Sequence, residues 1–297
     1  MKNCMGKPIF GRPKSIFTSP EMNPPVSLII AFYRKTKELG LILESLKHQT
    51  FKDFELIIAD DGSDETAVNE LKILISHYPG LAIRHVWHEK EGWRKNEILN
   101  KAVMATQGEY VVFIDGDCIL HPNFISEHYK YRKQGLVLGG RRVMLSDRLT
   151  KRITPGFLAK KSFPLRMVFL SFYDSLRKEG TDHAENALYL GKSFLRRLFN
   201  KKARNIQGCN FSLYKSDLIS INGFDERFRG PGGGEDDDIH YRGQNFGLQF
   251  ATLKFLAVQY HLYHRVLDRP QVNTDLMNEN RRNKVGYTPF GIEKMKI

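Results

Sequence analysis

Short apolar runs alternate with amphipathic stretches through the first half of the chain. Four runs indicate buried strands: Val26–Phe32, Phe54–Ala59, Leu81–Val86 and Tyr110–Ile114. Three stretches with apolar residues at helical spacing separate them: Lys37–His48, Glu65–His77 and Lys95–Thr106. This alternation predicts an α/β fold, with a central, mostly parallel sheet flanked by helices.

The rhythm loosens in the second half. A strand begins at Leu136, and the segments that follow are a long basic helical stretch, Ile206–Tyr214, a helix at Ser216–Ile221, a Gly-rich loop, a helix from about Glu235 and the strand-like Phe250–Val258. From Arg269 onward the chain is polar, and we expect it to extend over the surface.

Composition and charge narrow the class of protein. Hydrophobic residues make up 41% of the 297, enough for a sizeable core. The three cysteines, Cys4, Cys118 and Cys209, are odd in number and widely spaced, so we expect free thiols in a reducing compartment. The N-terminal residues lack the apolar core of a secretory signal, and no apolar run approaches the roughly 20 residues of a membrane span.

The net charge of +13 is concentrated in one region. Residues 151–204 hold 13 basic and 4 acidic residues, interleaved with the apolar clusters Leu165–Tyr173 and Phe194–Phe199. Such interleaving suits an anionic membrane surface at least as well as nucleic acid. An ordinary solvated basic helix face explains it almost equally well. We expect a cytoplasmic protein with peripheral contact at the inner face of the cell membrane, and no nucleic-acid partner.

Acidic residues follow two of the predicted strands. Residues 60–63 (Asp-Asp-Gly-Ser) and 115–117 (Asp-Gly-Asp) fall at strand ends, where ligands bind to open parallel sheets. Asp and Gly also form turns, so each cluster alone is weak evidence for a functional site. Two carboxylates two residues apart, as in 115–117, can face one divalent cation, which would stabilise the charge on a departing diphosphate. Arg94 could add a second positive charge there, or could be a surface charge flanking a helix.

A third acidic cluster and a histidine pair complete the candidate chemistry. Residues 232–238 (Gly-Gly-Gly-Glu-Asp-Asp-Asp) open a predicted helix, whose dipole alone would explain acidic residues. Four consecutive carboxylates exceed what a cap requires, and one of them could act as a general base. His261 and His264 follow the strand-like Phe250–Val258, and either imidazole could complete a metal site.

Taken together and in order, these motifs resemble the inverting glycosyltransferases of family two with the GT-A fold, including enzymes of the bacterial chondroitin-polymerase type. The resemblance rests on residues 26–33, 49–55, 60–63, 108–110 and 115–117. Downstream, residues 221–225 and 233–239 are similar to the acceptor motif of those enzymes and of animal galactosyltransferases. It covers the chain from about Pro25 to His264.

The resemblance implies how the chain is divided. Residues 1–24 would be a leader, 25–268 the GT-A domain and 269–297 a C-terminal tail. Within the domain, 25–145 would be the donor half, 151–204 a basic helical insertion and 205–268 a smaller acceptor-binding half.

The resemblance also implies a role for each donor-side residue. Asp61 and the backbone near Ala31 would contact the uracil of a UDP-sugar, and Arg94 would reach the base or the diphosphate. Gly116 would lie between Asp117, a direct ligand of Mn²⁺ or Mg²⁺, and Asp115, which would orient the ribose or the metal shell.

On the metal and acceptor side, the resemblance implies that His264 closes the metal's coordination sphere, with His261 as a further candidate. Glu235, next to Gly234, would hold the acceptor sugar, and Asp236 would be the general base of a single displacement with inversion.

Two departures from the family pattern concern the acceptor. Residues 230–232 (Gly-Pro-Gly) replace the aromatic residue that often precedes the acidic motif, and the basic insertion has no equivalent. The expected acceptor is a hydroxyl of a glycan or of a lipid-linked molecule.

Two other functions remain as alternatives. A sugar nucleotidyltransferase on a similar scaffold would use the metal without needing Asp236. A basic polyanion-binding module would explain the net positive charge but would not explain the acidic residues at the strand ends.

Overall fold

A seven-stranded sheet runs through the protein in this computed structural model, which describes residues 24–191, 206–230, 234–265, 268 and 270–294. From one edge to the other its strands are β3 (Ala82–Trp87), β2 (Phe54–Asp60), β1 (Val26–Phe32), β4 (Tyr110–Asp115), β8 (Phe211–Tyr214), β6 (Leu136–Gly139) and β9 (Gln249–Thr252). Only β8 runs antiparallel to its neighbours. The predicted α/β fold with a mostly parallel sheet is confirmed.

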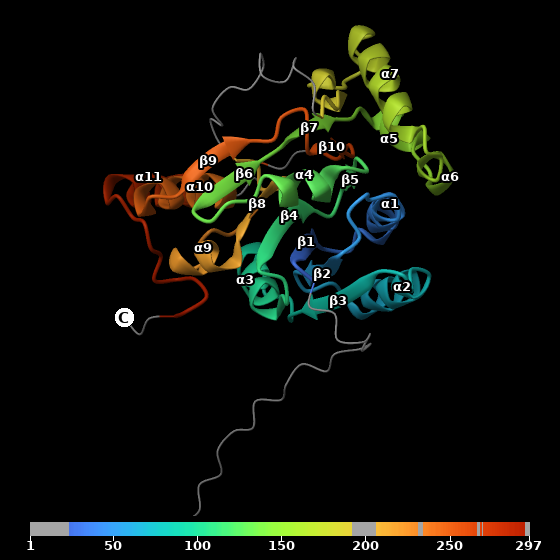
Figure 1. Ribbon diagram of the computed structural model, residues 1–297. Helices are drawn as coiled ribbons and strands as arrows, with labels where there is room; N and C mark the ends of the chain where they lie inside the picture. Colours follow the sequence, from blue (N-terminus) through green and yellow to red (C-terminus); the bar gives the residue numbers. More distant parts are fainter. Residues whose placement is uncertain (1–23, 192–205, 231–233, 266–267, 269, 295–297) are drawn as a thin grey trace, which may run out of the picture.

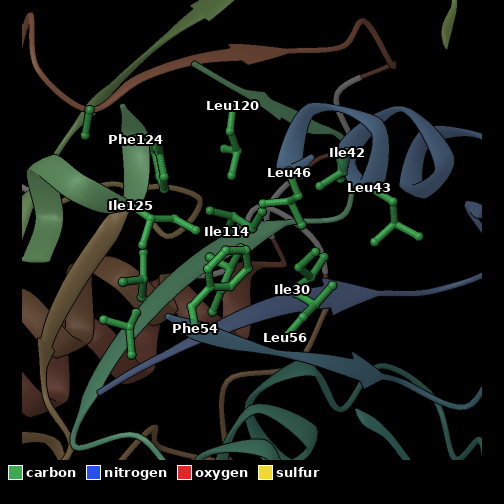
Figure 2. Close-up of a cluster of buried hydrophobic side chains, with 14 of the residues drawn as sticks. Ile30, Ile42, Leu43, Leu46, Phe54, Leu56, Ile114, Leu120, Phe124 and Ile125 are labelled. Atoms are coloured by element: carbon green, nitrogen blue, oxygen red, sulfur yellow. The ribbon is translucent and has the colours of Figure 1, made fainter. Parts of the chain in front are cut away.

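Helices cover both faces of this sheet (Figure 1). They are α1 (Thr36–Leu46), α2 (Glu65–Ser76), α3 (Lys95–Ala105), α4 (Phe124–Lys130), α9 (Lys215–Ser220) and α10 (Glu235–Phe246). Because successive strand residues point to opposite faces, Ile30 of β1 belongs to one core cluster with Leu46 of α1 and Phe124 of α4, which Figure 2 draws. Ile29 joins the second core with Ile98 of α3. The sheet therefore supplies two cores that hold its strand ends rigidly.

A second, three-stranded sheet lies beside the first. It consists of β5 (Cys118–Leu120), β10 (Val258–His261) and β7 (Arg141–Met144), with β10 in the middle. The register places His261 opposite Cys118. The predicted single strand Phe250–Val258 is wrong, because β9 and β10 belong to different sheets. The apolar residues between them are buried in a turn, so the apolar run is longer than either strand.

The described part of the basic stretch forms several short helices. These are α5 (Asp147–Arg152), α6 (Pro155–Leu158), α7 (Phe163–Leu176) and the 3-10 helix η1 (Ala184–Ala187). Their inner residues, such as Leu158 and Met167, pack on Tyr260 of β10. The predicted apolar cluster Phe194–Phe199 lies outside the described residues, as do Cys4 and the leader up to residue 23. In the described part of the chain, no helix has the length and apolar character needed to span a membrane.

The sequence led us to expect an extended C-terminal segment, and this prediction is wrong. Residues Gln271–Arg282 form the helix α11, which packs near α10. Buried polar contacts hold it: Asn280 donates to the carboxylate of Asp238 at 2.9 Å, and the fully buried Arg242 donates to the same carboxylate at 2.7 Å. Polarity misled the prediction here, because polar side chains make up much of the buried face of α11.

Candidate active site

Asp60 and Asp61, at the end of β2, do different work. Asp60 is fully buried, accepts a hydrogen bond from the amide of Ser63 and lies 3.0 Å from Nε2 of His85. It therefore builds the turn. Gly62 in that turn has φ +81°, and a Cβ there would lie 2.7 Å from Cα of Lys90, so only glycine fits.

Asp61 faces a cluster of donors beyond the strand ends. Its carboxylate lies 2.9 Å from His88 Nε2 and from Lys90 Nζ, and it accepts the backbone amide of Arg94. Burial would raise the pKa of Asp61, but the hydrogen bonds from His88 and Lys90 and the charge of Lys90 outweigh it and lower the pKa. Lys90 Nζ also lies 4.0 Å from the ring centroid of Tyr33, just after β1. Asp61 is thus a fixed carboxylate, and Lys90 links it to the ring of Tyr33.

Arg94 is the N-cap residue of α3, as the sequence placed it. Its guanidinium forms ion pairs with Glu91 and Glu97, at 3.1 and 3.2 Å. It also donates to the backbone oxygen of Glu89. In this arrangement the backbone of Arg94, rather than its charge, contacts the Asp61 cluster.

Asp115 ends β4, and β1 lies between this strand and β2, which precedes Asp61. It pairs with Nζ of Lys95 at 2.8 Å. Burial would raise the pKa of Asp115, yet the charge and hydrogen bond of Lys95 lower it to about 2, so the group is ionised at neutral pH. The next residue, Gly116, packs on β1, where a Cβ would approach the carbonyl oxygen of Ala31 to 2.7 Å. The predicted donor residues Ala31, Asp115 and Gly116 are therefore neighbours.

Two imidazoles converge on Asp117, which is buried. His261 Nε2 lies 3.3 Å from its Oδ1, and His264 Nε2 lies 3.4 Å from its Oδ2. Because His261 lies in β10, opposite Cys118 of β5, the small sheet fixes its position. The backbone amide of Leu262 also donates to the carbonyl of Asp117. Residues 144 positions apart in the chain thus meet.

The donor atoms around Asp117 suit a divalent transition metal. One carboxylate and two imidazole nitrogens form a mixed oxygen and nitrogen set of the kind such ions accept. Burial lowers the pKa of His261, which keeps its ring neutral as ligation requires. Its buried Nδ1 has no hydrogen-bond partner among the residues that the structure describes. Cys118 also places its sulfur within 4.8 Å of the Asp117 and His261 ligand atoms. Burial raises the pKa of that thiol, which makes it a poorer ligand.

Asp236, near the start of α10, is linked to the same region. Its carboxylate accepts the backbone amide of Gly208 at 2.9 Å. Cys209, the next residue, accepts from Arg142 of β7 and contacts Cys118, the neighbour of Asp117. Gly234 is the N-cap of α10, with φ +92°. Glu235 begins this helix, and Gly232 and Gly233 lie outside the described residues.

Several residues of this region were missed in the sequence. Lys35 donates to Asp117 Oδ2 at 2.7 Å, Lys95 pairs with Asp115, and Lys90 with His88 surrounds Asp61. Lys35, His88 and Lys90 follow the carboxyl ends of β1 and β3. The rule that picked out the acidic clusters would have found them too, had it been applied to basic residues.

Comparison with known proteins places this arrangement in a family. A sequence model described as glycosyl transferase family 2 matches residues 27–210. The chain belongs to this family. A second model, the N-terminal domain of galactosyltransferase, matches residues 196–265 and so includes the Asp236 and His261 segments.

Family 2 relatives align over much of the chain. The chondroitin synthase of Escherichia coli is 26% identical over 251 residues, which are 80% of this chain and 34% of that protein. The amylovoran biosynthesis glycosyltransferase AmsB of Erwinia amylovora is 23% identical over 91% of this chain and 77% of its own length. The chain spans about a third of the length of the first relatives it matches.

Solved glycosyltransferases share the GT-A fold with this family 2 chain. The mannosyltransferase PcManGT of Pyrobaculum calidifontis, in complex with GDP-Man and Mn²⁺, superposes with a TM-score of 0.53 at 15% identity, over 90% of this chain and 72% of that one. GalNAc-T7, with UDP, GalNAc and Mn²⁺, gives 0.56 at 13% identity over 81% and 44%. S. aureus TarS with UDP-GlcNAc gives 0.50 at 19% identity over 82% and 59%.

Proposed function

We propose that this protein is an inverting, metal-dependent glycosyltransferase. It moves a hexose or an N-acetylhexosamine from a UDP-sugar to a hydroxyl of a glycan or a lipid-linked acceptor. The observation that carries the proposal is the convergence of His261 and His264 on Asp117, two residues after Asp115. Relatives named for polysaccharide synthesis, and solved neighbours bound to nucleotide sugars, support the same chemistry.

The donor would bind along the ends of β1, β2 and β4. In this proposal Asp61 accepts a hydrogen bond from the uracil, next to Tyr33 and the backbone of Ala31. Asp115 orients the ribose or the metal shell, and Gly116 lets the chain approach closely. The amide of Arg94 holds Asp61, while Lys35 and Lys95 lie near enough to the paired carboxylates to meet diphosphate charge.

Asp117, His261 and His264 would hold the divalent cation, Mn²⁺ or Mg²⁺. When bound there, the cation supplies positive charge that stabilises the departing diphosphate. A bound cation would account for the two imidazoles that face this buried carboxylate.

Asp236 would be the general base. It takes the proton of the acceptor hydroxyl while that oxygen attacks the anomeric carbon from the side opposite UDP. The bond from the anomeric carbon to the diphosphate oxygen breaks, its electron pair leaves with UDP, and the configuration inverts. Gly234 and Glu235, just before Asp236, would position the acceptor sugar.

The proposed division of the chain follows from these roles. Residues 25–145 form the donor half, 151–204 the basic insertion and 205–268 the acceptor half. We place the protein in the cytoplasm, with peripheral contact to an anionic membrane through the insertion.

A panel of nucleotide sugars tests the function. The full chain is incubated with each sugar and Mn²⁺, with and without EDTA, and the released products are measured. We expect UDP release from one UDP-sugar and its loss with EDTA, and an inverted anomeric signal in the NMR spectrum of the product. Pyrophosphate release would instead favour the nucleotidyltransferase, and salt-sensitive polyanion binding indifferent to EDTA would favour the binding module.

A further inference from the structure

The outer face of α7 carries a row of exposed apolar side chains. Their exposed fractions range from 36% to 82%, in the order Leu165 60%, Phe169 67%, Phe172 36%, Tyr173 50% and Leu176 82%. The intervals of four, three, one and three residues place them on one side of the helix. We call this set the α7 stripe.

The inner face of α7 is already packed. Phe163 and Met167 are fully buried against the small sheet and α6, and Ser171 and Asp174 lie on the same side. The stripe is therefore not the core face of a badly placed helix. A helix that is apolar on both sides and already packs one side on the core indicates an apolar partner for its other side.

Positive charge flanks the stripe. Exposed basic residues stand before it, within it and after it: Lys160, Lys161, Arg166, Arg177 and Lys178. Of the acidic groups nearby, Asp174 is buried and accepts from Thr181, whereas Glu179 pairs at the surface with Arg148 and Arg177. The remaining basic residues, Lys160, Lys161, Arg166 and Lys178, still give this surface a positive charge. The surface that complements the α7 stripe is therefore apolar in its interior and anionic at its boundary.

We propose that the α7 stripe docks on an anionic lipid bilayer, with the helix lying in the plane of the headgroups. Fourteen residues of helix are about 21 Å long, too short to cross a bilayer but typical of a surface helix. Phe and Leu enter the acyl boundary, Tyr173 stays at the interface, and the lysines meet lipid phosphates. Figure 1 shows α7 at the periphery of the molecule, on the side of the small sheet and away from the seven-stranded sheet.

Docking through α7 would bring the transfer site to the membrane. The helices α5 to α7 continue directly from β7, and Thr150 of α5 accepts the amide of Tyr263, next to His264. The inference deepens the proposed function and rests on it in one respect: a lipid-linked acceptor would then reach Asp236 without leaving the bilayer.

A second copy of the chain is a less suitable occupant. In a twofold dimer the same surface meets itself, so the basic residues around one α7 stripe would face those of the other. One helix face is also narrow compared with the roughly 800 Å² per partner that stable interfaces bury. An anionic bilayer complements both the positive charge and the narrow apolar face of α7.

Flotation of the full chain with vesicles tests the docking. We compare phosphatidylcholine vesicles with vesicles that also contain phosphatidylglycerol, and we compare wild type with Phe169→Ser/Leu176→Ser. We expect wild type to float with the anionic vesicles. The double variant should bind them at least about tenfold more weakly. Lys160→Gln/Lys161→Gln should lose roughly fivefold per lysine, and only on anionic vesicles. The matched control, Ile73→Ser on α2, is equally exposed at 62% and should float as wild type does.

Two further measurements separate the failures. Slow UDP release without acceptor or vesicles should be unchanged in Phe169→Ser/Leu176→Ser, which shows that the variant folds and that the proposed chemistry stands apart from docking. Flotation of that variant equal to wild type would overturn the docking inference and leave the transferase proposal intact. Sedimentation velocity tests self-association. If wild type is a dimer, the double variant is a monomer and neither protein floats, the α7 stripe is a dimer interface and the docking inference is overturned.

Discussion

Nε2 of His261 lies 3.3 Å from Oδ1 of Asp117, although 144 residues separate the two in the chain. The contact exists because β10 pairs antiparallel with β5, which begins one residue after Asp117. A three-residue strand thus fixes a carboxylate, and the middle strand of the small sheet fixes the imidazole. The small sheet therefore positions His261 within β10 and Asp117 directly before β5, and His264 follows β10 by three residues.

Asp236→Asn should lower the turnover of transfer, because the amide cannot take the acceptor proton. We expect a decrease of about 10²- to 10⁴-fold in kcat, with little change in donor KM. Asp237→Asn, one position along α10, is the matched control and should retain most of the activity. Full transfer by Asp236→Asn would assign the base to another group.

Asp61→Asn should weaken donor binding more than chemistry. The carboxylate is an acceptor held by His88, Lys90 and the amide of Arg94, and an amide presents a donor in place of one oxygen. We expect KM for the UDP-sugar to rise about tenfold, with kcat within about threefold of wild type. Asp64→Asn, which keeps the N-cap of α2, is the control. A change confined to kcat would place Asp61 near the reacting bond instead.

The first half of the fold could be predicted from the sequence because its signals are local. Ile29 and Ile30 face opposite cores within one apolar run, and Asp61 and Asp115 follow strands that the alternation defines. The small sheet gave no such signal. Its strands are three or four residues long and pair only with segments far along the chain, so His261 looked like a residue after a strand rather than in one.

The sequence did not predict the buried polar contacts, for a related reason. Lys35 and Lys95 look like surface lysines until the strand ends bring Asp117 and Asp115 to them. In α11, Asn273 and Asn280 are buried and hydrogen-bonded, so hydrophobic spacing underestimates the face that packs. Burial of a hydrogen-bonded amide costs little, and no periodicity of apolar residues records it.

Arg242→Met should destabilise the protein strongly. The guanidinium is fully buried, pairs with Asp238 at 2.7 Å and donates to the carbonyls of Ile221 and Gly223. Its removal leaves a buried carboxylate without its cation, which costs about 3–5 kcal/mol in the free energy of unfolding. Urea denaturation measures this, with the exposed Arg282→Met expected within about 0.5 kcal/mol of wild type. A loss below about 1 kcal/mol for Arg242→Met would mean that the pair is dispensable.

His128 should make stability fall as the solution is acidified. Burial lowers its pKa to about 3, so the folded protein keeps the ring neutral while the unfolded chain binds a proton below about pH 6.5. The free energy of unfolding should therefore decrease by up to about 1.4 kcal/mol per pH unit between pH 6.5 and pH 3 from this group alone.

His128→Gln provides the comparison in urea denaturation. Glutamine can replace the hydrogen bonds to Ser212 and Asn210 but cannot titrate, so this part of the pH slope should vanish. The exposed His183→Gln should leave the slope unchanged. An equal slope in wild type and His128→Gln would show that His128 is protonated in the folded state.

The central claim is that a cation held by Asp117 and its two histidines is required for sugar transfer. The most direct measurement is the initial rate of UDP release by EDTA-treated enzyme as Mn²⁺ is added back, for wild type and Asp117→Asn in parallel. We predict no release without the cation, saturable recovery for wild type, and a rate at least about 100-fold lower for Asp117→Asn at the same Mn²⁺ concentration. Full release in EDTA, or recovery of Asp117→Asn with the wild-type Mn²⁺ dependence, would contradict it.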